Sequence, residues 1–227
     1  MAAPVWKKPV DVGNRLDKLF KLTKEQLLEV VEAMVRAKAD CTPNDPPGSL
    51  GWSAYKMGTR RLREVTLSEP DWEKDDTDQI PSVINKKLGV RIAVANTDDA
   101  TGLELEARIP QNRAQKGAAT DRVVHANQLS FVAALDESLK VVSIKKASSE
   151  PPKGVVTWYL CTYCEGEEFR AEISAPKRVD DGYFEDFYER IFLTGTDDGD
   201  GGEIVRRRGS GDSGPEFEIP VTRKKKK

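Results

Sequence analysis

Thiol and imidazole side chains are the first candidates for chemistry in this chain. Cys161 and Cys164 are separated by two residues, and thiolates at this spacing can bind one metal ion. A tetrahedral zinc site needs two further ligands, which Cys41 and His125 could supply. The alternative is that Cys161 and Cys164 pack as small apolar side chains near a hairpin end. Residues three apart on a strand point to opposite faces, which favours this alternative.

Oxygen-rich side chains form a second candidate site, directly after an apolar segment. Asn96, Asp98, Asp99 and Thr101 follow residues 90–95, which have the composition of a buried strand. Carboxylates at a strand end can hold Mg²⁺ for phosphoryl-transfer chemistry. The same residue types also make ordinary turns, because their side chains bond to nearby backbone amides. Both interpretations stay open.

Basic side chains form a third candidate site on a predicted helix over residues 52–65. The basic residues are Lys56, Arg60, Arg61 and Arg63, and Lys86 and Lys87 extend the set. Clustered positive charge binds phosphates, and neighbouring aromatics such as Trp52 and Tyr55 can stack on bases. The alternative is a solvated helix face balanced by acidic neighbours, with both aromatics in the core. The first interpretation predicts contact with nucleic acid.

The last part of the chain, residues 195–227, differs in composition from the rest. It contains seven of the 17 glycines and almost no apolar residues, so we expect a flexible tail. Three consecutive arginines, Arg206, Arg207 and Arg208, add positive charge for nucleic-acid binding. Residues 216–221 alternate in the manner of an edge strand, with Phe217, Ile219 and Val221 on one face. This strand would either close the protein's own sheet or add to the sheet of a partner.

Composition narrows the class of protein. The net charge is −2, the hydrophobic share is 38% and the charged share is 33%, so a core is expected beside unpacked segments. The sparse, odd number of cysteines predicts a reducing, cytoplasmic location. We see neither a signal peptide nor an apolar run long enough for a membrane, and therefore expect no membrane association. Phosphate-loop, dinucleotide, HExxH and GxSxG motifs are absent, and the single histidine disfavours general-base catalysis.

The elements that would position these residues predict an α+β fold. We expect an N-terminal arm over residues 1–22 and a single α+β domain over residues 23–194. Its helical half, about 23–135, contains helices over 24–39, 52–65, 81–88 and 120–135, and strands over 90–95 and 103–109. Thr23 and Gln26 form a capping box for the first helix. An antiparallel β-meander over residues 155–194 follows, with turns at 165–166 and 180–182.

These observations predict an interaction protein without catalytic activity. We expect a protein partner, contact with nucleic acid through the basic helix face and the tail, and no cofactor. The alternative is a divalent-metal-dependent hydrolase or nuclease that uses the loop at residues 96–101. The oligomeric state stays open.

Overall fold

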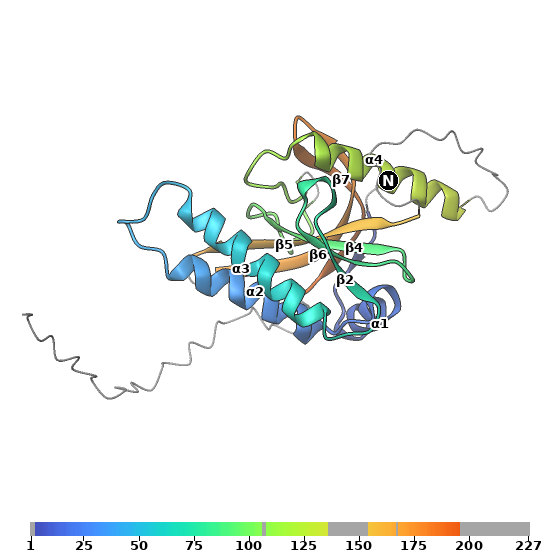
Figure 1. The fold of residues 1–227 in the computed structure, drawn as a ribbon, viewed down its shortest axis with the longest axis horizontal. Coiled ribbons are helices and arrows are strands. Elements are labelled where there is room, and N and C mark those ends of the chain that lie inside the picture. Colours follow the sequence, from blue (N-terminus) through green and yellow to red (C-terminus); the bar gives the residue numbers. More distant parts are fainter. Residues whose placement is uncertain (1–2, 106–107, 136–153, 167, 196–227) are drawn as a thin grey trace, which may run out of the picture.

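The fold is α+β, with N-terminal helices and a seven-stranded mixed sheet (Figure 1). The computed structural model describes residues 3–105, 108–135, 154–166 and 168–195. The candidate residues of the tail, from Arg206 to Val221, therefore lie outside the described residues. In chain order the elements are β1 (Val5–Trp6), α1 (Pro9–Phe20), α2 (Lys24–Ala39), α3 (Ser49–Thr66), β2 (Trp72–Asp75), the 3₁₀ turn η1 (Thr77–Gln79), β3 (Ser82–Asn85), β4 (Val90–Asn96), α4 (Ala118–Leu135), β5 (Val156–Glu165), β6 (Glu168–Asp180) and β7 (Tyr183–Phe192).

The strands lie side by side in the order β1-β7-β6-β5-β4-β3-β2. β4 and β5 are parallel, as are β1 and β7, and the remaining pairs are antiparallel. The antiparallel meander β5-β6-β7 confirms the prediction for residues 155–194, including both turns. The third strand of the meander, β7, includes Tyr188 to Phe192.

Helices cover both faces of the sheet. Helices α2 and α3 lie on one face and α4 lies on the other (Figure 1). Side chains of β4 alternate between these faces: Ile92 and Val94 join the core under α1–α3, whereas Ala93 and Ala95 join a smaller cluster on the α4 side. None of the helices among the described residues is long and apolar enough to span a bilayer.

The capping box predicted for α2 is present. The Thr23 hydroxyl accepts a hydrogen bond from the Gln26 backbone N–H, and Gln26 Oε1 accepts one from the Thr23 backbone N–H at 2.8 Å. The apolar stripe of α2, which includes Leu27, Val31 and Met34, is buried. Helix α3 matches the predicted helix over residues 52–65 with an earlier start, and α4 matches the predicted helix over residues 120–135.

Residues 3–22 hold more structure than we expected of the predicted arm over residues 1–22. Val12, Leu16 and Phe20 lie four residues apart on α1 and are buried in the main core. Phe20 packs edge-to-face on Trp158 of β5, with ring centroids 5.1 Å apart. The helix binds to the sheet through this stripe, which we did not predict from the sequence.

The predicted helix over residues 81–88 is wrong, because residues 82–85 form β3. This strand pairs with both β2 and β4, and all four of its residues are buried. Gly89, which directly follows the predicted helix, has a φ of +67° in the β3–β4 turn. A four-residue strand is too short to show a clear periodicity. The acidic segment over residues 68–78, for which no strand was predicted, likewise contains β2, in which Trp72 is buried.

The predicted strand over residues 103–109 is also wrong within its described residues. Residues 103–105 and 108–109 are irregular and pair with no strand. The Leu103 carbonyl instead accepts a hydrogen bond from Arg190 Nη2 at 3.0 Å, and Leu105 is exposed. In a strand the Leu103 carbonyl would accept a hydrogen bond from a neighbouring strand. Here it accepts one from Arg190.

Candidate functional site

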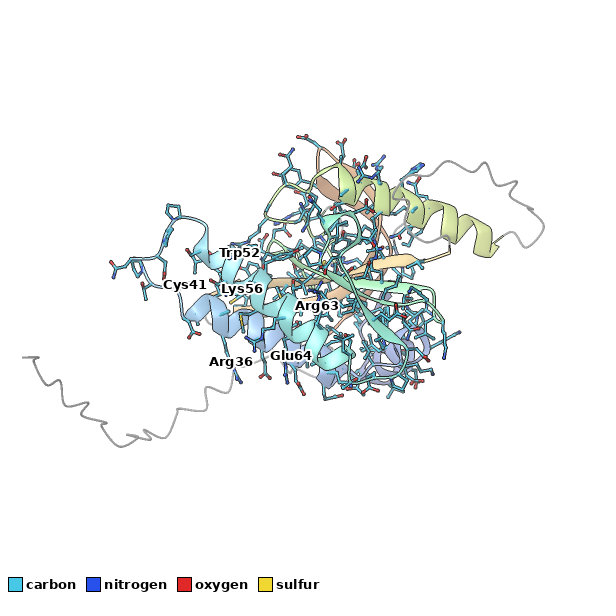
Figure 2. The ribbon with its side chains drawn as sticks, viewed as in Figure 1. Arg36, Cys41, Trp52, Lys56, Arg63 and Glu64 are labelled. Atoms are coloured by element: carbon cyan, nitrogen blue, oxygen red, sulfur yellow. The ribbon has the colours of Figure 1, made fainter. Side chains whose placement is uncertain are left out.

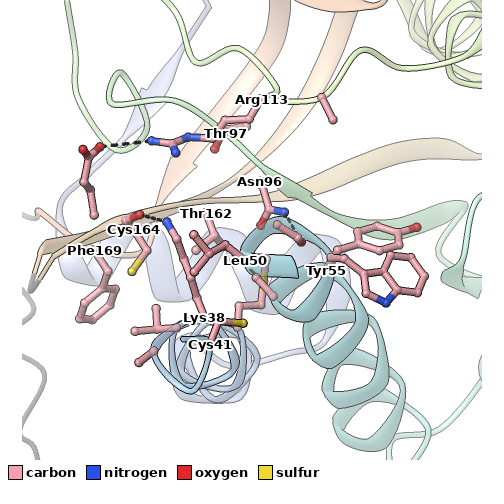
Figure 3. Close-up of a pocket in the computed structure, with 18 of the residues that line it drawn as sticks. Lys38, Cys41, Leu50, Tyr55, Asn96, Thr97, Arg113, Thr162, Cys164 and Phe169 are labelled. Carbon is pink, nitrogen blue, oxygen red and sulfur yellow. Dashed lines mark hydrogen bonds and ion pairs between the residues drawn. The ribbon is translucent and has the colours of Figure 1, made fainter. Parts of the chain in front are cut away.

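A cleft of about 2180 Å³ opens where the parallel strands β4 and β5 end (Figure 3). Asn96 and Thr97 border it at the end of β4, and Thr162 and Cys164 border it on β5. Ligand sites of open α/β sheets also lie at the carboxyl ends of parallel strands, because the connecting segments diverge there. The facing walls come from the end of α2, the start of α3 and the segment before α4.

Apolar and aromatic side chains form much of the wall. Val35 of α2, Leu50 of α3 and Phe169 of β6 line the cleft together with Trp52 and Tyr55. Trp52 is 64% exposed, which is unusual for a tryptophan, and its ring lies 6.0 Å from the ring of Tyr55. The interpretation that places Trp52 in the core is therefore wrong, while Tyr55 is half-buried.

The start of α3 is tied to the end of β4. Asn96 Nδ2 donates a hydrogen bond to the Gly51 carbonyl at 2.9 Å (Figure 3). Gly48 precedes the helix with a φ of +88° and supplies no side-chain cap, and the first turn carries no acidic residue. The partial positive charge of this helix end is therefore not offset locally.

Three of the cationic side chains that line the cleft have a partner. Arg36 pairs with Glu32 at 3.1 Å, and the Lys38 ammonium donates a hydrogen bond to the Cys164 carbonyl. Arg113 lies 3.3 Å from Glu165 and its guanidinium stacks over the Tyr163 ring. Both members of the Arg113–Glu165 pair are exposed, so this ion pair is weak and Arg113 can exchange partners.

Lys116 differs from these residues. No carboxylate of the described residues pairs with its ammonium, which lies 5.8 Å from the centroid of the Tyr159 ring. Burial lowers the pKa of Lys116 below its ordinary value, and the neighbouring Cys161 partly opposes this shift. The cleft thus contains one lysine that is held against apolar groups.

The predicted basic face of α3 is largely neutralised. Arg60 pairs with Glu64, Arg61 with Glu29 and Glu64, and Arg63 with Asp76. Lys86 pairs with Glu73 and Lys87 with Asp71, each at 2.6 Å. Of the six predicted basic residues outside the tail, only Lys56 has no acidic partner within the described ranges. It lies one helical turn after Trp52, whereas Arg63 and Glu64 lie further along α3 (Figure 2).

The four predicted zinc ligands do not converge. Cys161 belongs to the cluster on the α4 face, whereas Cys164 packs against the core on the opposite face. Cys41 and Cys164 border the cleft, but His125 is exposed on α4. Across the part of the chain that the structure describes, no group of three or more His, Cys, Asp and Glu side chains could hold a metal ion.

The acidic loop at residues 96–101 is held by its own hydrogen bonds. Asp98 Oδ1 accepts hydrogen bonds from the backbone N–H groups of Ala100 and Gln111. Asp99 pairs with Arg108, and this hydrogen bond lowers the pKa of the Asp99 carboxyl. These contacts favour the turn interpretation over the magnesium site.

Sequence reasoning missed the two cleft residues that follow this loop. Arg113 and Lys116 lie in the segment 110–117, for which we predicted neither an element nor a site. The sequence carries no local signal for them, because β4 ends at Asn96, well before this segment, and a hydrogen bond from the Arg113 N–H to the Asn96 carbonyl brings the segment back to the strand end.

Comparisons with known proteins give no relatives: neither a protein-family model, nor a curated protein, nor a solved structure matches this chain.

Proposed function

We propose that this protein is an interaction protein that binds single-stranded nucleic acid in the cleft at the carboxyl ends of β4 and β5. The observation that carries the proposal is the 64% exposed Trp52 beside Tyr55 on the wall of a 2180 Å³ cleft that Arg113 also lines. In this arrangement bases stack on Trp52, and Lys56 and Arg113 contact phosphates.

Aromatic exposure supports the choice of a single strand. Burying an indole contributes strongly to stability, so a tryptophan that stays exposed at a cleft is a candidate for ligand contact. Every base has an aromatic face, and in a single strand that face is free to stack on protein aromatics. In duplex DNA the faces are covered by neighbouring bases, so Trp52 would find no partner there.

Charge supports the same ligand. Lys56 is exposed without an acidic partner among the described residues, and Arg113 forms only an exposed ion pair. The uncapped start of α3 adds partial positive charge at the cleft. Phosphates could bind to these groups without breaking a buried interaction.

The size of the cleft supports a polymer over a small metabolite. Small-molecule sites usually enclose about 300–1,000 Å³. The cleft of about 2180 Å³ is larger than that range and is open along one side of the molecule. A chain of several nucleotides fits such a volume better than one small molecule does.

A fluorescence-anisotropy titration with labelled oligo-dT at low salt tests the proposal. We expect the full chain to bind, and Trp52→Ala to weaken binding about 5- to 150-fold, since stacking contributes about 1–3 kcal/mol per base. Trp52→Phe, which keeps an aromatic face, should lose less affinity than Trp52→Ala.

Leu67→Ala is the matched control, because Leu67 is an exposed apolar residue at the other end of the same helix. It should bind oligo-dT as the parent chain does. Absence of binding at low salt, or equal affinities for the parent chain and Trp52→Ala, would contradict the proposal. Stronger binding of duplex DNA than of oligo-dT would move the interface away from Trp52.

A further inference from the structure

We infer that Phe169 is a second base-stacking residue, at the opposite end of the cleft from Trp52, and that the ligand is a single strand long enough to contact both rings. Lys38 lies between the two rings and contacts the phosphates that link the bases. The inference rests on the proposed function, because it concerns the same cleft, and it adds the length and the path of the strand.

The sheet sets the separation of the two rings. Trp52 directly follows Gly51, whose carbonyl accepts a hydrogen bond from Asn96 at the end of β4. Phe169 lies on β6, and β5 lies between β4 and β6 in the sheet. Neighbouring strands are about 4.8 Å apart, so these two attachment points are separated by at least about 10 Å. Figure 3 accordingly shows Phe169 and Tyr55, the ring neighbour of Trp52, at opposite ends of the cleft.

This separation sets a minimum length for the strand. Neighbouring bases of a stacked strand are about 3.4 Å apart along its axis, so bases on the two rings are about three or more steps apart. A dinucleotide therefore reaches only one ring, whereas a strand of twelve nucleotides reaches both. The cleft volume of about 2180 Å³ has room for such a strand.

Phe169 has an aromatic surface on which no other ring or cation of the described residues stacks. Its side chain is half-buried, lines the cleft and packs against the main core. The nearby Tyr163 differs, because its ring is buried and carries the guanidinium groups of Arg113 and Arg170. The core contact already restricts the Phe169 side chain, so stacking on a base costs little further side-chain entropy.

Lys38 places positive charge between the two rings. Its ammonium donates a hydrogen bond to the carbonyl of Cys164, the β5 residue that pairs with Phe169. In Figure 3 the Lys38 side chain lies between Phe169 and Tyr55. An ammonium has three donors, so two remain for phosphate oxygens. No carboxylate in the described ranges forms an ion pair with this lysine, and a phosphate therefore displaces no acidic partner.

Titration of a labelled twelve-nucleotide oligo-dT against variants of Phe169 tests the inference on the full chain at low salt. Phe169→Leu keeps an apolar side chain against the core but has no aromatic face. We expect it to bind at least about 5-fold more weakly, since stacking contributes about 1–3 kcal/mol per base. Phe169→Tyr keeps the ring and should stay within about twofold of the parent chain. Tyr183→Leu, a half-buried aromatic outside the cleft, is the matched control and should bind as the parent chain does.

Strand length separates stacking from a purely structural role of Phe169. The thymidine dinucleotide is measured by its competition with the labelled strand. In Phe169→Leu it can still stack on Trp52, so its affinity should change by less than about twofold. An equal loss for the dinucleotide and the twelve-nucleotide strand would show that leucine disturbs the whole cleft, and would overturn the inference. Unchanged affinity of Phe169→Leu for the twelve-nucleotide strand would overturn it as well.

The salt dependence of binding tests the place of Lys38. Lys38→Gln should make the slope of log K against log salt concentration less steep by about 0.7 for the twelve-nucleotide strand. Lys21→Gln removes a cation that pairs with Asp17 on α1, and is the control that should leave the slope unchanged. The same slope in Lys38→Gln as in the parent chain, or an equal change in both variants, would contradict a phosphate contact at Lys38.

The inference and the proposed function can fail separately. If Trp52→Ala weakens binding of the twelve-nucleotide strand and Phe169→Leu does not, the second ring is wrong and the proposed function stands. If Phe169→Leu weakens binding and Trp52→Ala does not, the proposed role of Trp52 is wrong. If the parent chain does not bind oligo-dT at low salt, the proposed function is wrong and the inference fails with it.

Discussion

At the scale of single residues, burial separates three thiols that the sequence presents alike. Cys161 is fully buried, and burial raises the pKa of its thiol well above the ordinary value. Cys164 is half-buried, with a pKa that burial also raises. Cys41 lies half-buried at the end of α2, beside the cleft. Because the thiolate is the reactive form, these environments set an order of reactivity.

The order can be measured by thiol titration. In the native protein we expect a disulfide reagent such as Ellman's reagent to modify Cys41 first and Cys164 more slowly, while Cys161 reacts only after guanidinium unfolds the chain. Cys41→Ser should remove the fast phase and leave the slow phase unchanged. Rapid modification of Cys161 in the native protein would show that the α4 face of the sheet opens readily.

The burial of Tyr159 predicts that the folded state loses stability in alkaline solution. Burial raises its pKa from 10.0 to about 12, so the folded state keeps the proton longer than the unfolded state. Below pH 10 both states are protonated and the full stability is present. As the pH rises from 10 to 12, only the unfolded state loses the proton, so up to about 2–3 kcal/mol is lost.

Urea unfolding at pH 9 and pH 11.5 measures this loss. The parent chain should lose more unfolding free energy between the two pH values than Tyr159→Phe, which has no phenolic proton. Other groups that titrate in this range affect both proteins equally. Equal losses in the two proteins would contradict the assignment to Tyr159.

At the scale of elements, local patterns could be predicted and contacts between distant segments could not. The capping box at Thr23 is encoded within a few residues and was predicted. Burial along β6 does not alternate, because Glu172 and Ser174 are buried as fully as their apolar neighbours. The short strand β3 takes its hydrogen bonds from β2 and β4, so its identity depends on neighbours that local periodicity does not reveal. The cleft is lined by the ends of β4 and β5, the end of α2, the start of α3 and the segment before α4, which only the fold brings together. Several lining residues, such as Asn96, Trp52 and Cys164, drew attention in the sequence, but for other reasons.

The capping box gives a stability prediction for α2. Thr23→Ala removes the acceptor of the Gln26 N–H, and should lower the unfolding free energy by about 1 kcal/mol. Thr23→Ser keeps a hydroxyl and should lose only part of that. Urea denaturation at neutral pH measures both. A loss of unfolding free energy below about 0.2 kcal/mol in Thr23→Ala would show that water bonds to the Gln26 N–H as well as the Thr23 hydroxyl does.

A buried ion pair between β6 and β7 predicts a larger loss of unfolding free energy than the capping box does. Glu172 and Arg190 are almost fully buried, and their closest oxygen and nitrogen lie 2.6 Å apart. Glu172 Oε2 also accepts the Gly102 N–H at 2.8 Å, so the pair fixes the loop after β4. Glu172→Ala leaves a buried guanidinium without its carboxylate and should cost about 3–5 kcal/mol.

The Glu172→Met/Arg190→Met double variant should recover part of that loss, because it buries no unpaired charge. Glu73→Ala breaks the exposed pair with Lys86 and should change stability by less than about 1 kcal/mol. Guanidinium unfolding of Glu172→Ala, the double variant and Glu73→Ala measures these differences in unfolding free energy. A double variant no more stable than Glu172→Ala would show that the hydrogen bonds to the loop, and not the charge, hold the strands.

At the scale of the whole molecule, the distribution of charge decides which cations can bind a polyanion. The sequence presents a run of basic residues on α3, but acidic partners come from distant positions, such as Glu29 for Arg61 and Asp71 for Lys87. Charge counted along the chain could not reveal these distant pairs, although the pair of Arg60 with Glu64 is local to the helix. The structure leaves Lys56 without a partner among the described residues and Arg113 in a weak pair beside the cleft.

The salt dependence of oligo-dT binding to the full chain tests whether Lys56 and Arg113 are the cations that contact phosphates. Each phosphate contact on a single strand contributes about −0.7 to the slope of log K against log salt concentration. Lys56→Gln and Arg113→Gln should therefore each make the slope less steep by about 0.7. Arg60→Gln and Lys86→Gln remove cations that already have acidic partners, and should leave the slope unchanged. An equal change in slope for Arg60→Gln and Lys56→Gln would show that the nucleic acid binds along the outer face of α3, as the sequence alone suggests, and not in the cleft.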